Sequence, residues 1–233
     1  MNDKQQIRRQ LIARYEKLWP DASLSGRPPV FEGRGRAAER LRRQPVYRQA
    51  KVIAVMPDPV LLQVRINALG DGKTLIAATP GLKQGLVRIT PDQAPPPNRG
   101  RDLAGGALFK TGRQLRFPKA RMGKVDLLVG AALAVDRRGV ILGDGRGLLD
   151  LTYALLTIFG GGKHGGAPTA VIAAAEQLVD ELPSDEWDMG ANLCVTPDEA
   201  FRHQPAQPRP RLANLPPKLA SLPVVRWARE REK

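Results

Sequence analysis

The segment that decides the fold is Asp136-Arg-Arg-Gly139-Val-Ile-Leu-Gly143-Asp-Gly145-Arg-Gly147-Leu-Leu-Asp150. An apolar run at 125–129 precedes it, and residues 148–159 are apolar on nearly every face. The short apolar run indicates a buried strand, and the longer one indicates a buried helix. The pattern therefore predicts a strand, then a loop with a glycine at every second position, and then the N-terminus of a helix.

A glycine loop that leads into a helix is typical of an anion-binding site. Its backbone N–H groups can converge on a phosphate, and the helix dipole adds partial positive charge behind them. Arg146 lies inside the loop and can add a full charge. The alternative is that the glycines only form a tight turn and that Asp150 is only a first-turn acid, worth roughly 0.3–1 kcal/mol against the dipole. The loop is not a Walker loop, because no Gly-Lys-Ser/Thr follows it, and the glycine pattern leaves both interpretations open.

Strand-length apolar runs alternate with helical patterns along the rest of the chain. Strands are predicted at 51–56, 73–78, 125–129, 169–175 and 192–195, and helices at 3–18, 36–44, 60–69 and 148–159. The strand–helix–strand pattern over 51–78 predicts a βαβ unit with a parallel pair of strands. Thr196-Pro197 predicts the start of a further short helix. We therefore expect a three-layer α/β/α fold with a mainly parallel sheet, in which ligands bind at the carboxyl ends of the strands.

Length and composition favour a single domain with an extension. The chain has 233 residues, and its composition shifts at residue 204 to alternating proline and arginine. We expect an α/β domain over 1–203 and a partly disordered tail over 204–233. The N-terminus lacks the apolar core of a signal peptide and no apolar run is long enough to span a membrane, so the cytoplasm is the expected location. A single cysteine, Cys194, excludes an internal disulfide and is predicted to be a small buried apolar side chain.

Three features of the charge distribution each have two interpretations. The net charge of +14 either serves phosphate-rich ligands or nucleic acid, or reflects arginines on solvated faces, which we favour. Lys4 and Arg8 flank the apolar stripe of the first helix and either reach a phosphate or are solvated. His164, in the glycine-rich loop 160–166, is favoured as a surface residue over a catalytic one.

An ordered set of motifs resembles one known family, the 5-formyltetrahydrofolate cyclo-ligases (5,10-methenyltetrahydrofolate synthetases), and in particular its divergent cyclo-ligase-like branch. The resemblance covers about residues 4–200. The motifs that resemble the family are Lys4-x-x-x-Arg8, Val55-Met-Pro-Asp58 with Arg65 and Leu69, Val125-Asp-Leu-Leu-Val129, Asp136-Arg-Arg-Gly139, Gly143-x-Gly145-x-Gly147-x-x-Asp150 with Leu151 and Tyr153, Glu176-Gln-Leu-Val-Asp-Glu-Leu-Pro183, Asp188, and Val195-Thr-Pro197.

The resemblance implies a NagB/RpiA/CoA transferase-like fold and an ATP- and Mg²⁺-dependent ligase of folate one-carbon metabolism. In that chemistry the formyl oxygen of 5-formyltetrahydrofolate attacks the γ-phosphate of ATP, a ring nitrogen then closes on the activated carbon, and phosphate leaves. It requires charge neutralisation on the phosphates more than a protein nucleophile. The implied roles are cofactor binding by Lys4, Arg8, Gly143, Gly145, Arg146 and Gly147, catalysis by Arg146 and Asp150, and Mg²⁺ coordination by Asp150 and Asp136, because a hard cation prefers oxygen ligands.

Several positions depart from the family pattern. Asp144, Leu148 and Leu149 stand where the family has tyrosines, and Trp187 stands where it has a histidine before Asp188. Its folate-pocket segment has no clear counterpart over 109–120. Two alternatives therefore stay open: a substrate-shifted enzyme of the same fold, and a non-catalytic nucleotide-binding relative that binds RNA through its basic surface. Steep salt dependence of oligonucleotide binding would favour the RNA-binding relative.

Overall fold

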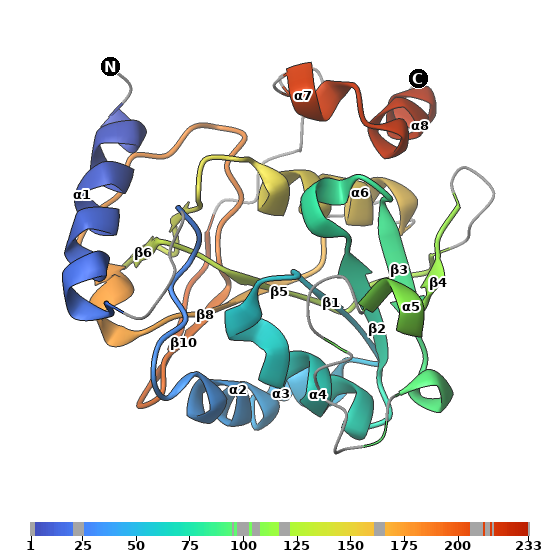
Figure 1. The fold of residues 1–233 in the computed structure, drawn as a ribbon, viewed down its shortest axis with the longest axis horizontal. Coiled ribbons are helices and arrows are strands. Elements are labelled where there is room, and N and C mark those ends of the chain that lie inside the picture. The colour runs from blue at the N-terminus through green and yellow to red at the C-terminus, as the bar shows by residue number, and fades with distance from the viewer. Residues whose placement is uncertain are drawn as a thin grey trace.

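The polypeptide folds into a large sheet between two layers of helices (Figure 1). The computed structural model describes residues 3–20, 26–94, 96, 103, 108–116, 122–160, 166–205, 212, 215 and 217–232. This architecture confirms the predicted three-layer α/β fold. His164 and most of the loop around it lie outside the described residues.

The central sheet has the strand order β11-β10-β8-β5-β1-β2-β3-β4, and its five middle strands run parallel. β1 pairs with β2 from Val52 opposite Thr74, which confirms the predicted βαβ unit. The parallel strands are almost entirely buried because helices cover both faces of the sheet. Their bounds are β1 Val52–Val55, β2 Thr74–Ala78, β5 Leu127–Ala131, β8 Thr169–Ile172 and β10 Leu193–Val195, with antiparallel β3 Leu86–Ile89, β4 Arg113–Gln114 and β11 Ala200–Arg202 at the edges.

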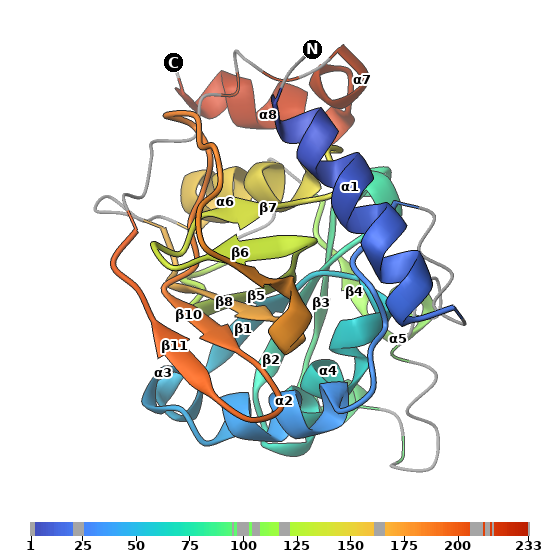
Figure 2. The same ribbon diagram turned by 90° about the vertical axis from the view of Figure 1, so that its left-hand side faces the viewer.

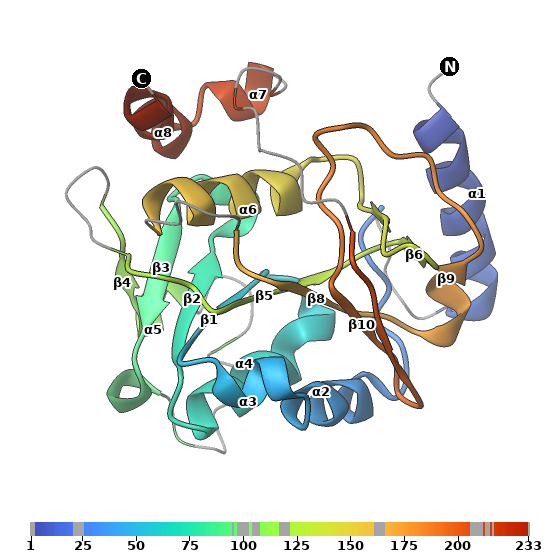
Figure 3. The same ribbon diagram turned by 180° about the vertical axis from the view of Figure 1, so that it is seen from behind.

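Helices cover the two faces of the sheet unequally (Figures 1 and 3). Three helices lie on one face, and α2 buries Ala37, Ala38 and Leu41 there, as its sequence pattern predicted. On the other face α6 lies against the sheet, and Gly130 of β5 leaves room for the side chain of Leu149. The bounds are α2 Arg34–Arg42, α3 Pro45–Gln49 and α4 Leu62–Gly70 on the first face, α6 Leu148–Phe159 on the second, and α5 Leu108–Thr111 beside β3 and β4.

A second, three-stranded sheet was not predicted. It consists of β6 Ala134–Asp136, β7 Ile141–Leu142 and β9 Leu178–Val179, in the order β7-β6-β9. The helix α1, Asp3–Leu18, packs across it through Leu11 and Tyr15 (Figure 2). The glycine loop therefore follows β7 of this small sheet and does not directly follow a strand of the parallel sheet. Strands of two or three residues are too short to show a periodic pattern, so sequence reasoning missed them.

The helix expected at Thr196-Pro197 was wrong. The Thr196 side-chain oxygen accepts hydrogen bonds from the backbone N–H groups of Asp198 and Glu199, and the Glu199 carbonyl accepts one from the Thr196 N–H. These bonds close a tight turn between β10 and the antiparallel β11. Thr196 thus stabilises a hairpin turn. A threonine side chain can accept hydrogen bonds from the following N–H groups both in turns and at helix starts, so the sequence alone did not distinguish the two. Cys194 of β10 is fully buried, as predicted.

The end of the chain forms two helices, α7 Pro217–Ala220 and α8 Pro223–Glu232, on the far side of α6 (Figure 1). The side chains of Val224, Val225 and Ala228 are buried in the main core. We expected partial disorder over 204–233, and most of residues 206–216 lie outside the described part of the chain. The division of the chain at residue 203 stays a prediction.

Candidate active site

The glycine loop, residues 143–147, connects β7 to α6. Gly145 and Gly147 have φ angles of 86° and 66°, a left-handed conformation that favours glycine. Gly147 is the N-cap of α6, and its carbonyl accepts the first helical hydrogen bond, from the Leu151 N–H. The backbone N–H groups of α6 that precede Leu151 have no partner within the helix. The loop therefore presents the positive end of a helix, as the glycine spacing predicted.

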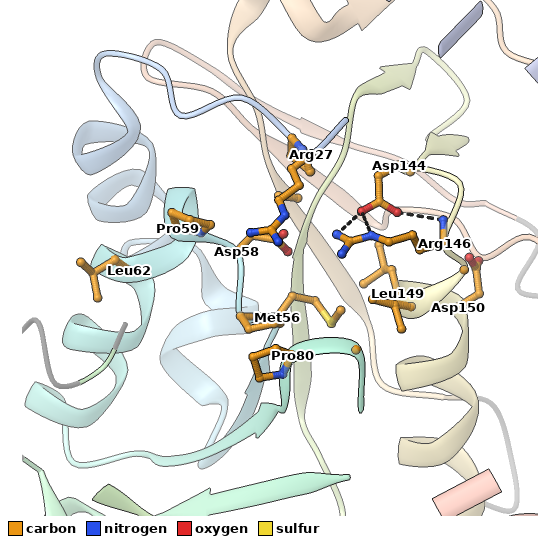
Figure 4. A pocket seen from close by; sticks show the side chains of 17 residues that line it. Arg27, Met56, Asp58, Pro59, Leu62, Pro80, Asp144, Arg146, Leu149 and Asp150 are labelled. Atoms are coloured by element: carbon orange, nitrogen blue, oxygen red, sulfur yellow. Dashed lines mark hydrogen bonds and ion pairs between the residues drawn. The ribbon is translucent and has the colours of Figure 1, made fainter. Parts of the chain in front are cut away.

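Two side chains of this loop form an ion pair (Figure 4). Asp144 accepts a hydrogen bond from Nε of Arg146 at 2.7 Å and one from the Arg146 backbone N–H at 2.9 Å. The hydrogen bond to Asp144 raises the pKa of Arg146. Since the two charges lie side by side, Arg146 offsets the repulsion that Asp144 would exert on a phosphate.

A first cavity, which we call the sheet-edge cavity, has a volume of about 220 Å³. It lies at the carboxyl ends of β1, β2 and β5, the edge at which ligands bind in parallel sheets. The glycine loop forms the opposite wall, and Arg146 lines this cavity (Figure 4). Its other lining side chains include Met56, Asp58, Pro80, Leu148 and Leu149.

A second cavity, the α1–α6 cavity, has a volume of about 390 Å³ and adjoins the first at the glycine loop. Lys4 and Arg8 of α1 line it together with Gly143, Gly145, Gly147 and Asp150. The structure thus brings together six of the eight residues predicted to form the site. The remaining walls are mostly apolar and include Tyr153, Trp187, Met189, Leu212 and Leu215.

The two cations of α1 that line this cavity, Lys4 and Arg8, are held in place by hydrogen bonds. Nε of Arg8 donates a hydrogen bond to the Gly143 carbonyl at 2.8 Å, so α1 is tied to the glycine loop. Lys4 forms ion pairs with Asp185, at 2.6 Å, and with Asp188. Burial lowers the pKa of Lys4, but the hydrogen bonds and charges of the two aspartates outweigh it and raise the pKa overall. Lys4 is therefore buried and ion-paired, which excludes the solvated alternative.

Asp150 lies where the two cavities meet, because it lines both. Its Oδ1 accepts a hydrogen bond from the Met189 N–H at 3.2 Å. Burial raises the pKa of Asp150 above the ordinary value of 3.8, and the negative charge of Asp188 raises it further. The carboxylate of Asp150 is half-buried, and the second carboxylate nearby, Asp188, already pairs with Lys4. Asp150 therefore fits a divalent ion that is bound mainly by phosphate oxygens.

Asp136, the other predicted metal ligand, lines neither cavity. Its buried carboxylate accepts hydrogen bonds from the backbone N–H groups of Arg138, Val140 and Leu182 and an ion pair from the Arg138 guanidinium. These partners fill the coordination positions that a metal would need, and we do not retain Asp136 as a ligand. Among the described residues, no group of three or more His, Cys, Asp or Glu side chains could hold a metal ion by itself.

Sequence reasoning did not assign Asp58 and Arg65 to the site. Asp58 lines the sheet-edge cavity, and burial, followed by the charge of Asp144, raises its pKa. The Arg65 side chain is fully buried and donates hydrogen bonds to the carbonyls of Leu103, Met56 and Asp58, so it fixes the backbone beneath that cavity. The available signal was a polar residue directly after a buried strand, Pro57-Asp58-Pro59, at an edge where ligands bind.

Sequence comparison with known proteins gives matches to one family and to its relatives. A sequence model of the 5-formyltetrahydrofolate cyclo-ligase family matches residues 1–197. A methenyltetrahydrofolate synthase domain-containing protein of Mus musculus is 32% identical over 217 residues, which cover 89% of this chain and 57% of that protein. A 5-formyltetrahydrofolate cyclo-ligase of Mycolicibacterium smegmatis is 34% identical over 83 residues, 35% of this chain and 38% of that protein. The chain spans about half the length of the curated relatives it matches over most of its own length.

One solved structure supports the fold. The NMR structure of the 5,10-methenyltetrahydrofolate synthetase of Aquifex aeolicus superimposes with a TM-score of 0.56 at 18% identity, covering 88% of this chain and 94% of that one. At this identity the likeness concerns the fold. No helix in the described part of this chain is both long and apolar enough to cross a membrane.

Proposed function

The chain belongs to the 5-formyltetrahydrofolate cyclo-ligase family, and from this premise we propose that it is an ATP- and Mg²⁺-dependent ligase that converts 5-formyltetrahydrofolate into 5,10-methenyltetrahydrofolate, with release of ADP and phosphate. One observation carries the proposal. Gly143, Gly147, Leu149 and Asp150 line both cavities, so the two cavities adjoin at the glycine loop and ligands bound in them come close to each other there. Transfer of a phosphoryl group from one ligand to the other requires such a meeting point.

The α1–α6 cavity is assigned to the nucleotide. Its polar side combines Arg8 and the loop N–H groups, which suit phosphate oxygens, with Lys4, which pairs with Asp185 and Asp188 in the same wall. Its other walls suit an apolar base. Asp150, with Asp188 beside it, offers carboxylate oxygens for Mg²⁺, which neutralises charge on the phosphates when bound. A complete protein cage is not needed, because Mg²⁺ is commonly held by one or two carboxylates plus phosphates.

The sheet-edge cavity is assigned to the reduced folate. A volume of about 220 Å³ suits the ring end of such a ligand, with the remainder outside the cavity. Met56, Leu149 and the prolines supply apolar walls, and Asp58 supplies an acceptor for a ring N–H. In this arrangement the formyl oxygen faces the γ-phosphate where the two cavities adjoin, and Arg146 lies in the sheet-edge cavity to balance the negative charge that develops.

A direct assay tests the proposal. Purified protein is incubated with 5-formyltetrahydrofolate, ATP and Mg²⁺, and the absorbance of methenyltetrahydrofolate is followed together with phosphate release. We expect turnover that depends on all three components and is abolished in Asp150→Asn. The matched control is Asp180→Asn, which removes an exposed carboxylate that pairs with Arg137, and neither residue lines a cavity of the site. Turnover that Asp150→Asn leaves unchanged would remove Asp150 from the site.

A second candidate is a nucleotide-binding relative that acts on a different substrate. The observation that favours it is the set of departures at the cavities themselves, where Asp144, Leu148, Leu149 and Trp187 replace the tyrosines and histidine of the family pattern. The same experiment separates the two candidates. Stabilisation of the protein by ATP in a thermal shift measurement, without turnover of 5-formyltetrahydrofolate, would support the substrate-shifted relative.

A further inference from the structure

The C-terminal segment, by which we mean the described residues 212, 215 and 217–232, packs against the proposed nucleotide cavity. It lies beyond the residues that match the family. The helix α8 is anchored by Val224, Val225 and Ala228, which are at most 2% exposed and belong to the same core as α6. Val224 also approaches the turn at Gly85, where an added Cβ would lie 3.8 Å from it. Buried apolar side chains of this kind fix a helix against the body of a protein.

The part of this segment that precedes α8 reaches the cavity. Leu212, 1% exposed, and the half-buried Leu215 both line it. The Arg229 guanidinium of α8 donates a hydrogen bond to the Leu212 carbonyl at 2.9 Å, which ties the cavity wall to the anchored helix. Leu219 of α7 packs beside the glycine loop, because an added Cβ at Gly147 would lie 3.6 Å from its Cδ1.

The chemistry of these side chains limits what they can contact. Phosphate oxygens are matched by Lys4, Arg8 and the loop N–H groups, whereas leucine side chains offer only apolar surface. A nucleoside triphosphate has one large apolar part, its base. From these contacts we infer that Leu212 and Leu215 form a wall against the nucleotide base, so that the C-terminal segment is part of the nucleotide site. The inference rests on the assignment of this cavity to a nucleotide.

The test compares two ligands and two matched pairs of variants. Dissociation constants for Mg-ATP and for Mg-tripolyphosphate, which has phosphates but no base, are measured by calorimetry. Leu215→Ser removes a wall side chain, and Leu222→Ser is its control, because Leu222 is a half-buried leucine of the same segment that does not line the cavity. Arg229→Ala releases the bond to Leu212, and Arg226→Ala is its control, since the Arg226 guanidinium donates to the Ser221 carbonyl within the segment itself.

We expect Leu215→Ser to weaken ATP binding about tenfold and to leave tripolyphosphate binding within about twofold, because only apolar contact with the base is lost. Arg229→Ala weakens ATP binding in the same selective way, whereas neither control variant does. Equal losses for ATP and tripolyphosphate would overturn the inference, as would ATP binding by Leu215→Ser and Arg229→Ala that matches their controls.

The experiment separates this inference from the proposed function. Selective loss of ATP affinity in a protein that does not turn over 5-formyltetrahydrofolate would uphold the role of the segment and reject the cyclo-ligase activity. Turnover with no effect of Leu215→Ser and Arg229→Ala on ATP binding would do the reverse. A wild-type protein that binds neither ATP nor tripolyphosphate would reject both.

Discussion

Asp150 is expected to weaken the stability of the free protein at neutral pH. Burial raises its pKa above the ordinary value of 3.8, so its neutral form is favoured in the folded state. The folded state is therefore favoured below that ordinary value, and stability is lost as the pH rises through the raised pKa. We predict that Asp150→Asn, which keeps the acceptor for the Met189 N–H, unfolds at higher urea concentration than wild type at about pH 8, with a smaller difference at about pH 5.

The same substitution should remove Mg²⁺-dependent nucleotide binding, which makes Asp150 a residue at which stability is exchanged for function. A difference in unfolding midpoint that does not change with pH would contradict the assignment of a raised pKa. Asp180→Asn serves as the control here as well, because the exposed pair between Asp180 and Arg137 contributes little to stability.

Arg65 is predicted to stabilise the backbone under the sheet-edge cavity. Arg65→Ala leaves the carbonyls of Leu103, Met56 and Asp58 without this donor in a buried site and also creates a cavity. We expect the free energy of unfolding in urea to fall by about 3 kcal/mol. Arg48→Ala removes an exposed arginine and should change it by less than about 0.5 kcal/mol. Equal stability of the two variants would show that the buried guanidinium is dispensable.

Residues whose role depends on distant neighbours were the hardest to assign from sequence. Lys4 and Arg8 were identified as candidates, but only the fold shows that Lys4 is neutralised by Asp185 and Asp188, which follow it by more than 180 residues. Asp136 matched a motif, yet its hydrogen bonds to Arg138, Val140 and Leu182 serve the small sheet. A motif fixes a position along the chain, whereas burial and partners decide what the side chain does.

Among the elements, the glycine loop contains three glycines, two of which, Gly143 and Gly147, allow a matched comparison. Gly145 and Gly147 have left-handed φ angles, whereas Gly143 does not and has no atom within 4 Å of an added Cβ. A left-handed conformation costs a non-glycine residue roughly 1–2 kcal/mol. We predict that Gly147→Ala lowers the free energy of unfolding by about that amount and that Gly143→Ala changes it by less than about 0.5 kcal/mol. Urea titration of both variants measures this, and similar losses in the two would contradict the loop conformation.

Elements with a long or strongly periodic pattern were predicted well. The helix α6 was placed at its observed bounds, and α1, α2 and the parallel strands were located within a few residues. The small sheet was missed because its strands have two or three residues. The tail helix α8 was not predicted, because its alternating charges hide the small apolar face of Val224, Val225 and Ala228 that the core covers.

At the scale of the whole molecule, the fold places two adjoining cavities at one loop. The parallel sheet provides the first cavity at its carboxyl edge, and the small sheet positions α1 so that its cations reach the second. The net charge of +14 does not by itself indicate nucleic acid. Several arginines have structural partners: Arg40 donates to the Pro197 carbonyl, Arg65 to three carbonyls and Arg146 to Asp144.

We propose that the γ-phosphoryl group of ATP is transferred to the formyl oxygen of the folate where the two cavities adjoin at the glycine loop. The most direct measurement uses 5-formyltetrahydrofolate labelled with ¹⁸O in its formyl group, with ATP and Mg²⁺, and analyses the released phosphate by mass spectrometry. We predict one ¹⁸O atom in each phosphate released, because the formyl oxygen leaves bonded to phosphorus when the ring closes. Phosphate that instead carries oxygen from solvent water would mean that ATP is hydrolysed without transfer between the two cavities, and would contradict the proposal.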